Sequence, residues 1–253
     1  MPVYRLDHRP VFPPPERAEP SGLLAVGGDL SVERLVKAYE RGIFPWYVAG
    51  QPILWWSPHP RCVLETNALH VSKSLRKCLR ANGFEVRFDS TFADVIKACA
   101  TTPRRDQDGT WITAEMEAAY NRLHEEGYAH CVETWMEGRL VGGIYGVFLG
   151  RVFFGESMFS RATNASKVAM VALVDFLRKL DVDMIDCQVT SDHLLTLGAR
   201  EIHRREFLRK IGNAIEEYPT SRELWTGGGP CSYLAVIASS RENRFEKNSQ
   251  AEP

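Results

Sequence analysis

The sequence lacks most of the features that would place it in a specialised class of protein. Its six cysteines include no C-x-x-C pair, which argues against a structural zinc site and against a small disulfide scaffold. No stretch approaches the roughly 18 consecutive apolar residues of a membrane span, and the N-terminus has no apolar signal segment. We therefore expect a cytoplasmic protein without membrane contacts, whose thiols are reduced and mostly buried.

An excess of charge of either sign is also missing. The chain has 31 Lys and Arg against 32 Asp and Glu, so the whole molecule exerts no general attraction on nucleic acid. Any RNA-binding surface must come from local segregation of basic side chains. The 253 residues, 44% of them hydrophobic, are enough for one large domain or two unequal ones with a sizeable core.

Several nucleotide-binding and hydrolytic motifs are absent. The chain has no P-loop, no dinucleotide fingerprint, no H-E-x-x-H and no G-x-S-x-G. The sequence thus offers no means of hydrolysing ATP, and the energy for any transfer reaction must arrive in an activated substrate. We expect no cofactor and no metal ion.

The first 60 residues are expected to form a small separate domain. The first ten to twenty residues, which end in Pro13-Pro14-Pro15, are expected to form a stiff extended tether rather than a folded element. Ser31 is a suitable N-cap for a helix over about 32–41, which Gly42 would end. The segment 43–60 is rich in proline and tryptophan without periodicity, which predicts a loop.

The remaining chain alternates between helical and strand patterns. Helices are expected at about 71–82, 91–101, 114–126, 165–180, 191–197 and 204–216, and strands at about 84–88, 129–135, 139–148, 151–158 and 184–189. This order predicts an α+β fold with helices packed on a mostly antiparallel sheet over residues 61–240. The polar residues 241–253 are expected to be disordered.

A basic stripe follows one face of the helix expected at 71–82. Its cations repeat at the spacing of one helical face, and no acid shares that face. Four charges of one sign would repel one another on a solvated helix, so an anionic partner such as a phosphate backbone is the better explanation. The stripe consists of Lys73, Arg76, Lys77 and Arg80.

Aromatic residues gather where no core periodicity is present. Exposed aromatic faces near a basic patch would suit unstacked bases of a single-stranded RNA end. Tryptophans can equally fill the junction between two domains, and the sequence alone does not decide between these roles. The residues are Trp46, Trp55, Trp56 and Trp111.

Acidic and amide side chains stand within two apolar strands. In the strand at 184–189, alternation places Asp186, Gln188 and Thr190 on one face and Ile185 on the other. Glu156 lies within the apolar strand at 151–158, where burial of a carboxylate costs several kcal/mol unless it is paired or functional. Two carboxylates near one sheet could bind a cationic group, although a polar strand face is often only the solvent face.

Seven motifs in order together resemble the leucyl/phenylalanyl-tRNA–protein transferases, from about residue 22 to residue 205. They are Gly22-Leu-Leu-Ala-Val-Gly-Gly-Asp-Leu30, Arg41-Gly-Ile-Phe-Pro-Trp46, Ile53-Leu-Trp-Trp-Ser-Pro58, Gly109-Thr-Trp-Ile-Thr113, Phe154-Gly-Glu-Ser-Met-Phe-Ser-Arg161, Asn164-Ala-Ser-Lys167 and Ile185-Asp-Cys-Gln188.

The resemblance implies a small N-terminal domain followed by a domain with the fold of the GCN5-related acetyltransferases (GNAT). It implies transfer of Leu or Phe, and possibly Met, from aminoacyl-tRNA to proteins beginning with Arg or Lys, which marks them for degradation by the N-end rule pathway. We expect a monomer. By resemblance, the catalytic residues are Asp186, Gln188 and Glu156, and the aminoacyl and adenosine pocket contains Trp46, Trp111, Phe153, Gly155, Met158, Ile185 and Thr190.

The route of the proton stays open at this level. The attacking α-amine must lose a proton, and Asp186, Glu156, a relay through Gln188 or the ribose hydroxyl of the substrate could receive it. Alternative functions are an acetyl-CoA-dependent N-acetyltransferase, a transferase for N-terminal Asp or Glu, and a non-catalytic RNA-binding module. The first is disfavoured because the turn at 159–165 lacks the glycines that cradle a pyrophosphate.

Overall fold

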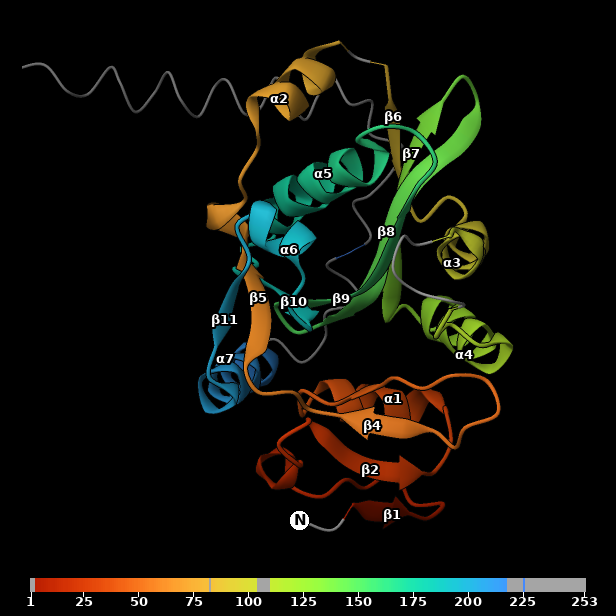
Figure 1. Cartoon of the computed structure of the whole chain (residues 1–253), viewed down its shortest axis with the longest axis vertical. Coiled ribbons are helices and arrows are strands. Elements are labelled where there is room, and N and C mark those ends of the chain that lie inside the picture. Colours follow the sequence, from red (N-terminus) through yellow and green to blue (C-terminus); the bar gives the residue numbers. More distant parts are fainter. Residues whose placement is uncertain (1–2, 82, 104–109, 218–224, 226–253) are drawn as a thin grey trace, which may run out of the picture.

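The computed structural model describes residues 3–81, 83–103, 110–217 and 225. Its N-terminal part forms a small four-stranded sheet with a helix beside it (Figure 1). The order across the sheet is β1 (Tyr4–Leu6), β2 (Leu23–Gly27), β4 (Leu54–Trp56) and β3 (Phe44–Pro45), and the helix is α1 (Val32–Tyr39). The Ser31 side chain accepts a hydrogen bond from the main-chain N–H of Arg34, so the predicted cap is confirmed.

Two predictions for this region are wrong. The expected tether instead contributes β1, which pairs in parallel with β2, and a 3-10 helix, η1 (Pro15–Arg17). The expected loop over 43–60 contains β3 and β4, and the Trp55 side chain is fully buried with its Nε1 donating to the Gly27 carbonyl at 2.8 Å. Strands of two or three residues are too short to give a periodic signal, so the sequence did not indicate them.

The rest of the chain is organised around a seven-stranded sheet in the described residues. Its order is β11 (Arg200–Ile202), β5 (Arg61–Glu65), β10 (Met184–Gln188), β9 (Val152–Ser160), β8 (Arg139–Leu149), β7 (Ala129–Met136) and β6 (Glu85–Phe88). Every neighbouring pair is antiparallel except β9 and β10, which run parallel. The predicted α+β arrangement with a mostly antiparallel sheet is confirmed.

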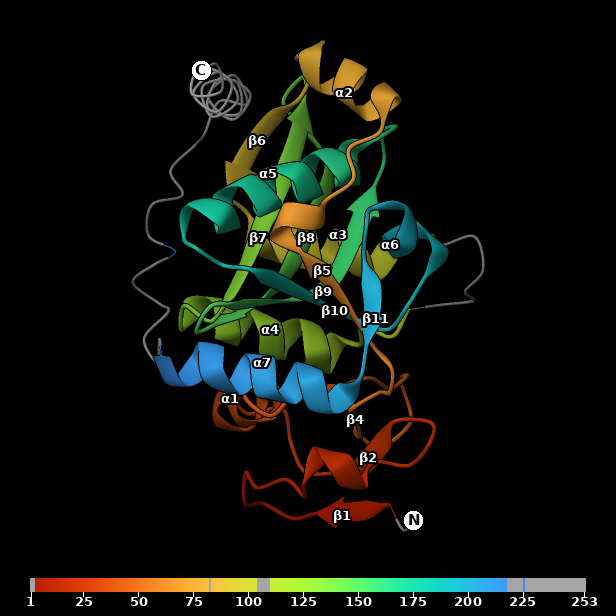
Figure 2. The same cartoon turned by 90° about the vertical axis from the view of Figure 1, so that its left-hand side faces the viewer.

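Helices cover both faces of this sheet (Figures 1 and 2). One face carries α2 (Lys73–Arg80) and α5 (Ala165–Lys179), and the other carries α3 (Phe92–Thr101) and α4 (Ala114–Glu125). The chain also forms η2 (Thr66–Ala68), α6 (Asp192–Thr196) and α7 (Arg204–Glu217), the last of which contacts β9. Among the described residues, no helix has both the length and the apolar character needed to cross a membrane.

Two strands of the large sheet were not predicted. β5 occupies an interior position between β11 and β10, and its first four residues are buried. Because both of its faces are covered, it shows no alternation of polar and apolar residues, and it begins with a charged residue, Arg61. β11 has only three residues, two of them exposed and charged, so nothing marks it as a strand.

Candidate active site

The site lies where β9 and β10 separate. The two parallel strands pair only as far as Phe154 and Asp186, after which β9 continues along β8. β10 instead forms a bulge against β5 between Asp186 and Gln188, and Gln188 adopts a left-handed backbone conformation with φ of 62°. This conformation is uncommon for a residue other than glycine, and such backbone strain is often found at functional sites.

Glu156 of β9 and Gln188 of β10 meet across this separation. The Gln188 Nε2 donates to Glu156 Oε1 at 2.6 Å, and the Tyr39 hydroxyl donates to the same oxygen at 2.7 Å. The Tyr120 hydroxyl donates to the other oxygen, Oε2, at 3.0 Å, and the two tyrosine hydroxyl oxygens lie in contact with each other. The carboxylate is thus held by three donors from α1, α4 and β10.

Burial changes the proton affinity of this cluster. Desolvation raises the pKa of Glu156 to about 7, although the hydrogen bonds from Tyr39, Tyr120 and Gln188 oppose the rise. Burial also raises the pKa values of both tyrosines well above their usual range, so their hydroxyls remain protonated donors. Glu156 can therefore take up and release a proton near neutral pH, as a general base must.

Asp186 forms a buried ion pair with Arg61. The arginine Nε donates to Oδ1 at 2.8 Å and its Nη2 to Oδ2 at 2.6 Å, and the two residues are 1% and 0% exposed. The guanidinium lies between the rings of Phe44 and Phe207, with centroid distances of 4.9 and 4.5 Å. The main-chain N–H of Gln188 donates to Asp186 Oδ1 at 2.9 Å, so this carboxylate also fixes the bulge.

The predicted pocket residues divide between the two faces of the sheet. Phe153 and Ile185 are paired across β9 and β10 and are buried in the core beneath α5, on the face opposite Glu156. Gly155 and Met158 are half-buried, and the half-buried Thr190 donates its hydroxyl to Glu201 at 2.6 Å.

The predicted tryptophans belong to other elements. Trp46 is 36% exposed and contacts Trp56 edge-on with a centroid distance of 5.7 Å. Trp111 is half-buried and packs against the core that contains α3 and α4. An exposed aromatic face is thus available at Trp46, but not at the buried Trp55.

Sequence reasoning missed three residues of the site: Tyr39, Tyr120 and Arg61. The periodicity of α1 and α4 identified their buried faces but not the partner that a buried tyrosine hydroxyl requires. Two tyrosines on buried helix faces, together with a glutamate in an apolar strand, could have suggested a shared cluster. The charge at the start of an otherwise apolar β5 was a similar signal for Arg61.

The basic stripe of α2 faces outward as predicted. All four of its cations are exposed, whereas Leu75 and Leu79 are buried beneath the helix. None of the four forms an ion pair within the part of the chain that the structure describes. The stripe therefore offers unneutralised positive charge to a partner.

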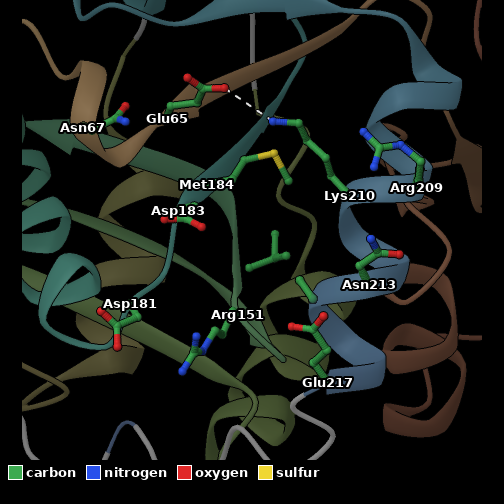
Figure 3. Close-up of a pocket in the computed structure, with 12 residues that line it drawn as sticks. Glu65, Asn67, Arg151, Asp181, Asp183, Met184, Arg209, Lys210, Asn213 and Glu217 are labelled. Carbon is green, nitrogen blue, oxygen red and sulfur yellow. Dashed lines mark hydrogen bonds and ion pairs between the residues drawn. The ribbon is translucent and has the colours of Figure 1, made fainter.

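Two other clusters of polar side chains lie apart from Glu156. At the Met184 end of β10, opposite Gln188, a cavity of about 530 Å³ runs along α7 (Figure 3). It contains charges of both signs, among them Glu65 and Lys210 at 3.4 Å, so it has no clear preference for an ion of one sign. Its lining comprises Glu65, Asn67, Arg151, Val152, Asp181, Asp183, Met184, Arg209, Lys210, Asn213, Ala214 and Glu217.

The second cluster contains possible metal ligands at the junction of α4 and β7. Asp89, His124 and His130 place ligand atoms within 4.8 Å of one another. His130 Nδ1 lies 2.8 Å from Asp89 Oδ2, and His124 Nδ1 lies 2.8 Å from the Ala129 carbonyl. These contacts already satisfy the groups, so a metal ion is not required to explain the cluster.

The sequence of the chain matches a known protein family. Residues 63–212 match the family described as leucyl/phenylalanyl-tRNA protein transferase, and residues 28–59 match the N-terminal domain of the same family. A solved structure described as L-PGS from Bacillus licheniformis shares 11% identity and a TM-score of 0.35, covering 67% of this chain and 54% of that one. This likeness is too distant to bear on the fold.

The relatives match over most of this chain and most of their own length. A leucyl/phenylalanyl-tRNA–protein transferase of Syntrophobacter fumaroxidans is 58% identical over 91% of this chain and 98% of its own length. Proteins of the same name from Azoarcus sp. and Anaeromyxobacter sp. strain K are 57% and 55% identical, covering 89% and 90% of this chain and 92% and 98% of their own lengths. The chain belongs to the leucyl/phenylalanyl-tRNA protein transferase family.

Proposed function

We propose that this chain transfers Leu or Phe from aminoacyl-tRNA to the N-terminus of proteins that begin with Arg or Lys. Family membership and the names of the relatives support the donor and the reaction. The observation that carries the chemistry is the Glu156–Gln188 pair at the separation of β9 and β10. The preference for basic acceptors and the link to N-end rule degradation follow from family resemblance, and we propose that the protein acts as a cytoplasmic monomer.

The reaction needs alignment and one proton acceptor. The acceptor's α-amine attacks the ester carbonyl, the bond from the carbonyl carbon to the ribose oxygen breaks, and that oxygen takes up a proton as it leaves. Because the ester is already activated, neither ATP nor a metal ion is required. Positioning the two reactants supplies most of the rate acceleration.

Glu156 is the proposed proton acceptor and Gln188 orients the amine. The amide nitrogen of Gln188 donates to Glu156, so its amide oxygen points away and is available to accept an N–H from the substrate. The pKa of Glu156, raised by burial to about 7, lets the carboxylate accept the proton that the amine loses as the peptide bond forms. An amide is too weak a base to take that role itself.

Asp186 acts as a positioning residue in this scheme. Both of its oxygens are engaged by Arg61, and Oδ1 also holds the main-chain N–H of Gln188. A buried carboxylate with these partners is a poor receptor for the side chain of an acceptor protein. Its contribution is to fix the bulge that directs the Gln188 side chain towards Glu156.

Binding of the donor would involve two parts of the tRNA: its aminoacylated terminal adenosine and its phosphate backbone. The aminoacyl side chain and the terminal adenosine would bind beside Glu156, next to Gly155, Met158 and Thr190 and with Trp46 and Trp111 at the border, whereas Phe153 and Ile185 are core residues beneath α5. The exposed cations of α2 would contact the phosphate backbone.

For the architecture, we propose a small domain at 1–60, a catalytic domain at 61–240 with the GNAT fold, and a tail at 241–253. A mostly antiparallel sheet with one parallel pair and helices on both faces supports this assignment. Acetyl-CoA is not the proposed donor, because the turn into α5 has no glycine and begins the helix from Asn164 at φ of 69°.

Transfer of labelled leucine from leucyl-tRNA to a test protein beginning with Arg is the decisive assay. The same protein beginning with Asp or Glu is the matched control for acceptor charge, and the Glu156→Gln variant is the control for the site. Label on the Arg acceptor alone, lost in the variant, would support the proposal. Label on the acidic acceptor would identify the alternative transferase, and no label on either would overturn the proposed function.

A further inference from the structure

Two cysteines occupy neighbouring strands beside the site. Cys62 lies in β5 and stands opposite Gln188 of β10, while Val63 stands opposite Asp186. Cys187 is the bulged residue between Asp186 and Gln188, so it faces the same short stretch of β5. Both side chains lie in the same core cluster, close enough for the two thiols to interact.

Each thiol is joined directly to the residues that hold the site together. Cys62 follows Arg61, the partner of Asp186, and Cys187 separates Asp186 from Gln188. Cys62 is fully buried, whereas Cys187 is half-buried. An oxidant can therefore reach the pair through Cys187, and Cys62 is in place to react with it.

The surroundings of the two thiols shift their pKa values in opposite directions. The neighbouring Cys187 thiol lowers the pKa of Cys62, although its burial opposes this. The same contact with Cys62, together with burial, raises the pKa of Cys187 well above its usual range, so Cys62 is the sulfur that attacks a peroxide.

We propose that Cys62 and Cys187 are an oxidation site at which a peroxide forms a reversible disulfide that stops transfer. The loss of transfer rests on the proposed function, whereas disulfide formation does not. In the first step one sulfur attacks the peroxide, the O–O bond breaks, and a sulfenic acid and water form. The second sulfur then attacks the sulfenic acid, the S–S bond forms, and a second water leaves, so two thiols and one peroxide give one disulfide and two waters.

The disulfide would displace Gln188. An S–S bond is about 2.0 Å long, shorter than any contact between two thiols, so its formation draws the bulge towards β5. Gln188 is held on the other side by bonds of 2.6 Å to Glu156 and 2.9 Å to Asp186, which a shift of about 1 Å would break. Misplacement on this scale costs roughly tenfold to a hundredfold in rate.

The test treats the full-length protein with hydrogen peroxide and follows two independent readouts. Peptide mapping under non-reducing conditions should find Cys62 linked to Cys187, and leucine transfer should fall about tenfold or more in parallel and return with dithiothreitol. The Cys62→Ala and Cys62→Ser variants should keep transfer under peroxide. Cys99→Ala, which removes another buried cysteine, should respond as the wild type does.

Several outcomes would overturn the proposal. One is an oxidised protein that contains no link between Cys62 and Cys187. Another is equal inactivation of wild type and Cys62→Ala by peroxide, which would assign the loss to another residue. A linked protein that still transfers leucine at the full rate would refute the effect on the site. Absence of transfer before any oxidation would instead refute the proposed function and leave the mapping result to decide the disulfide.

Discussion

The Nε2 atom of Gln188 lies 2.6 Å from Oε1 of Glu156, and this contact joins β9 to β10 beyond the point where their main chains stop pairing. The strands are otherwise free to diverge after Phe154 and Asp186. The hydrogen bond therefore fixes how far the two strands diverge at Glu156 and Gln188. Changes to Glu156 should affect both geometry and proton transfer, and the two effects can be separated by pH.

Replacement of Glu156 by Gln should slow leucine transfer by about 10²–10⁴-fold, because the substituted amide cannot accept a proton. In the wild type, the rate should rise with pH through the pKa of Glu156, about 7, and then level off. Single-turnover transfer measured between pH 5.5 and 8.5 would test this. The control is Glu216→Gln on the exposed surface of α7. If the transfer rate of Glu156→Gln still rose with pH around pH 7, Glu156 would not be the proton acceptor.

The same carboxyl should make stability depend on pH. Its folded-state pKa of about 7 lies above the reference value of 4.5, so the folded protein binds a proton that the unfolded chain releases. Stability from this group is complete below about pH 4.5 and is lost as pH rises towards 7, by about 3 kcal/mol. Urea unfolding of wild type and Glu156→Gln at pH 5, 6, 7 and 8 should show the variant gaining relative stability as pH rises. A difference that is constant with pH would exclude the raised pKa.

The buried pair of Arg61 and Asp186 should be sensitive to loss of either member. The Asp186→Ala variant leaves the Arg61 guanidinium without its carboxylate partner among aromatic rings. We expect a loss of about 3–5 kcal/mol in the free energy of unfolding. The double variant Arg61→Met with Asp186→Leu should recover most of that stability but not transfer, because the Gln188 N–H still lacks its acceptor. Full transfer by the double variant would show that Asp186 is not a positioning residue.

The large sheet and most helices were predictable from the sequence because their apolar residues repeat at the period of a strand or a helix. Asp186, Gln188 and Glu156 were predictable because polar groups in apolar strands are conspicuous. Arg61 was not, because the contact that explains it spans 125 positions and depends on which strands lie side by side. Tyr39 and Tyr120 share a partner only because α1 and α4 pack together, which no local pattern encodes.

The basic stripe of α2 should act on tRNA affinity and not on the chemical step. Lys77→Glu and Arg80→Glu should each weaken binding of leucyl-tRNA, and the slope of log K against log salt should fall by about 0.7–0.9 per lost phosphate contact. Transfer from an aminoacyl-adenosine, which lacks the phosphate backbone, should be unchanged. Lys97→Glu, an exposed charge reversal on α3, is the matched control. If these variants lost transfer equally from leucyl-tRNA and from aminoacyl-adenosine, then α2 would not act by binding tRNA.

Gly146 of β8 should tolerate no side chain, because the neighbouring strand β9 lies tightly against it. A Cβ atom there would stand 2.2 Å from the Phe154 carbonyl oxygen and 2.6 Å from the Phe153 ring. Since main chain cannot yield as a flexible side chain can, Gly146→Ala should cost at least about 1–3 kcal/mol and shift the strand that carries Glu156. Both urea stability and transfer should fall together.

Gly212 of α7 provides the matched comparison for this substitution. A Cβ atom at that position would meet nothing within 4 Å, so Gly212→Ala should stabilise the helix by about 0.5–1 kcal/mol and leave transfer unchanged. Comparing Gly146→Ala with Gly212→Ala separates the effect of steric crowding on stability from the general effect of adding a methyl group. If Gly146→Ala were as stable and as active as Gly212→Ala, then β9 would not be held against β8 at this position, and the placement of Glu156 would need another explanation.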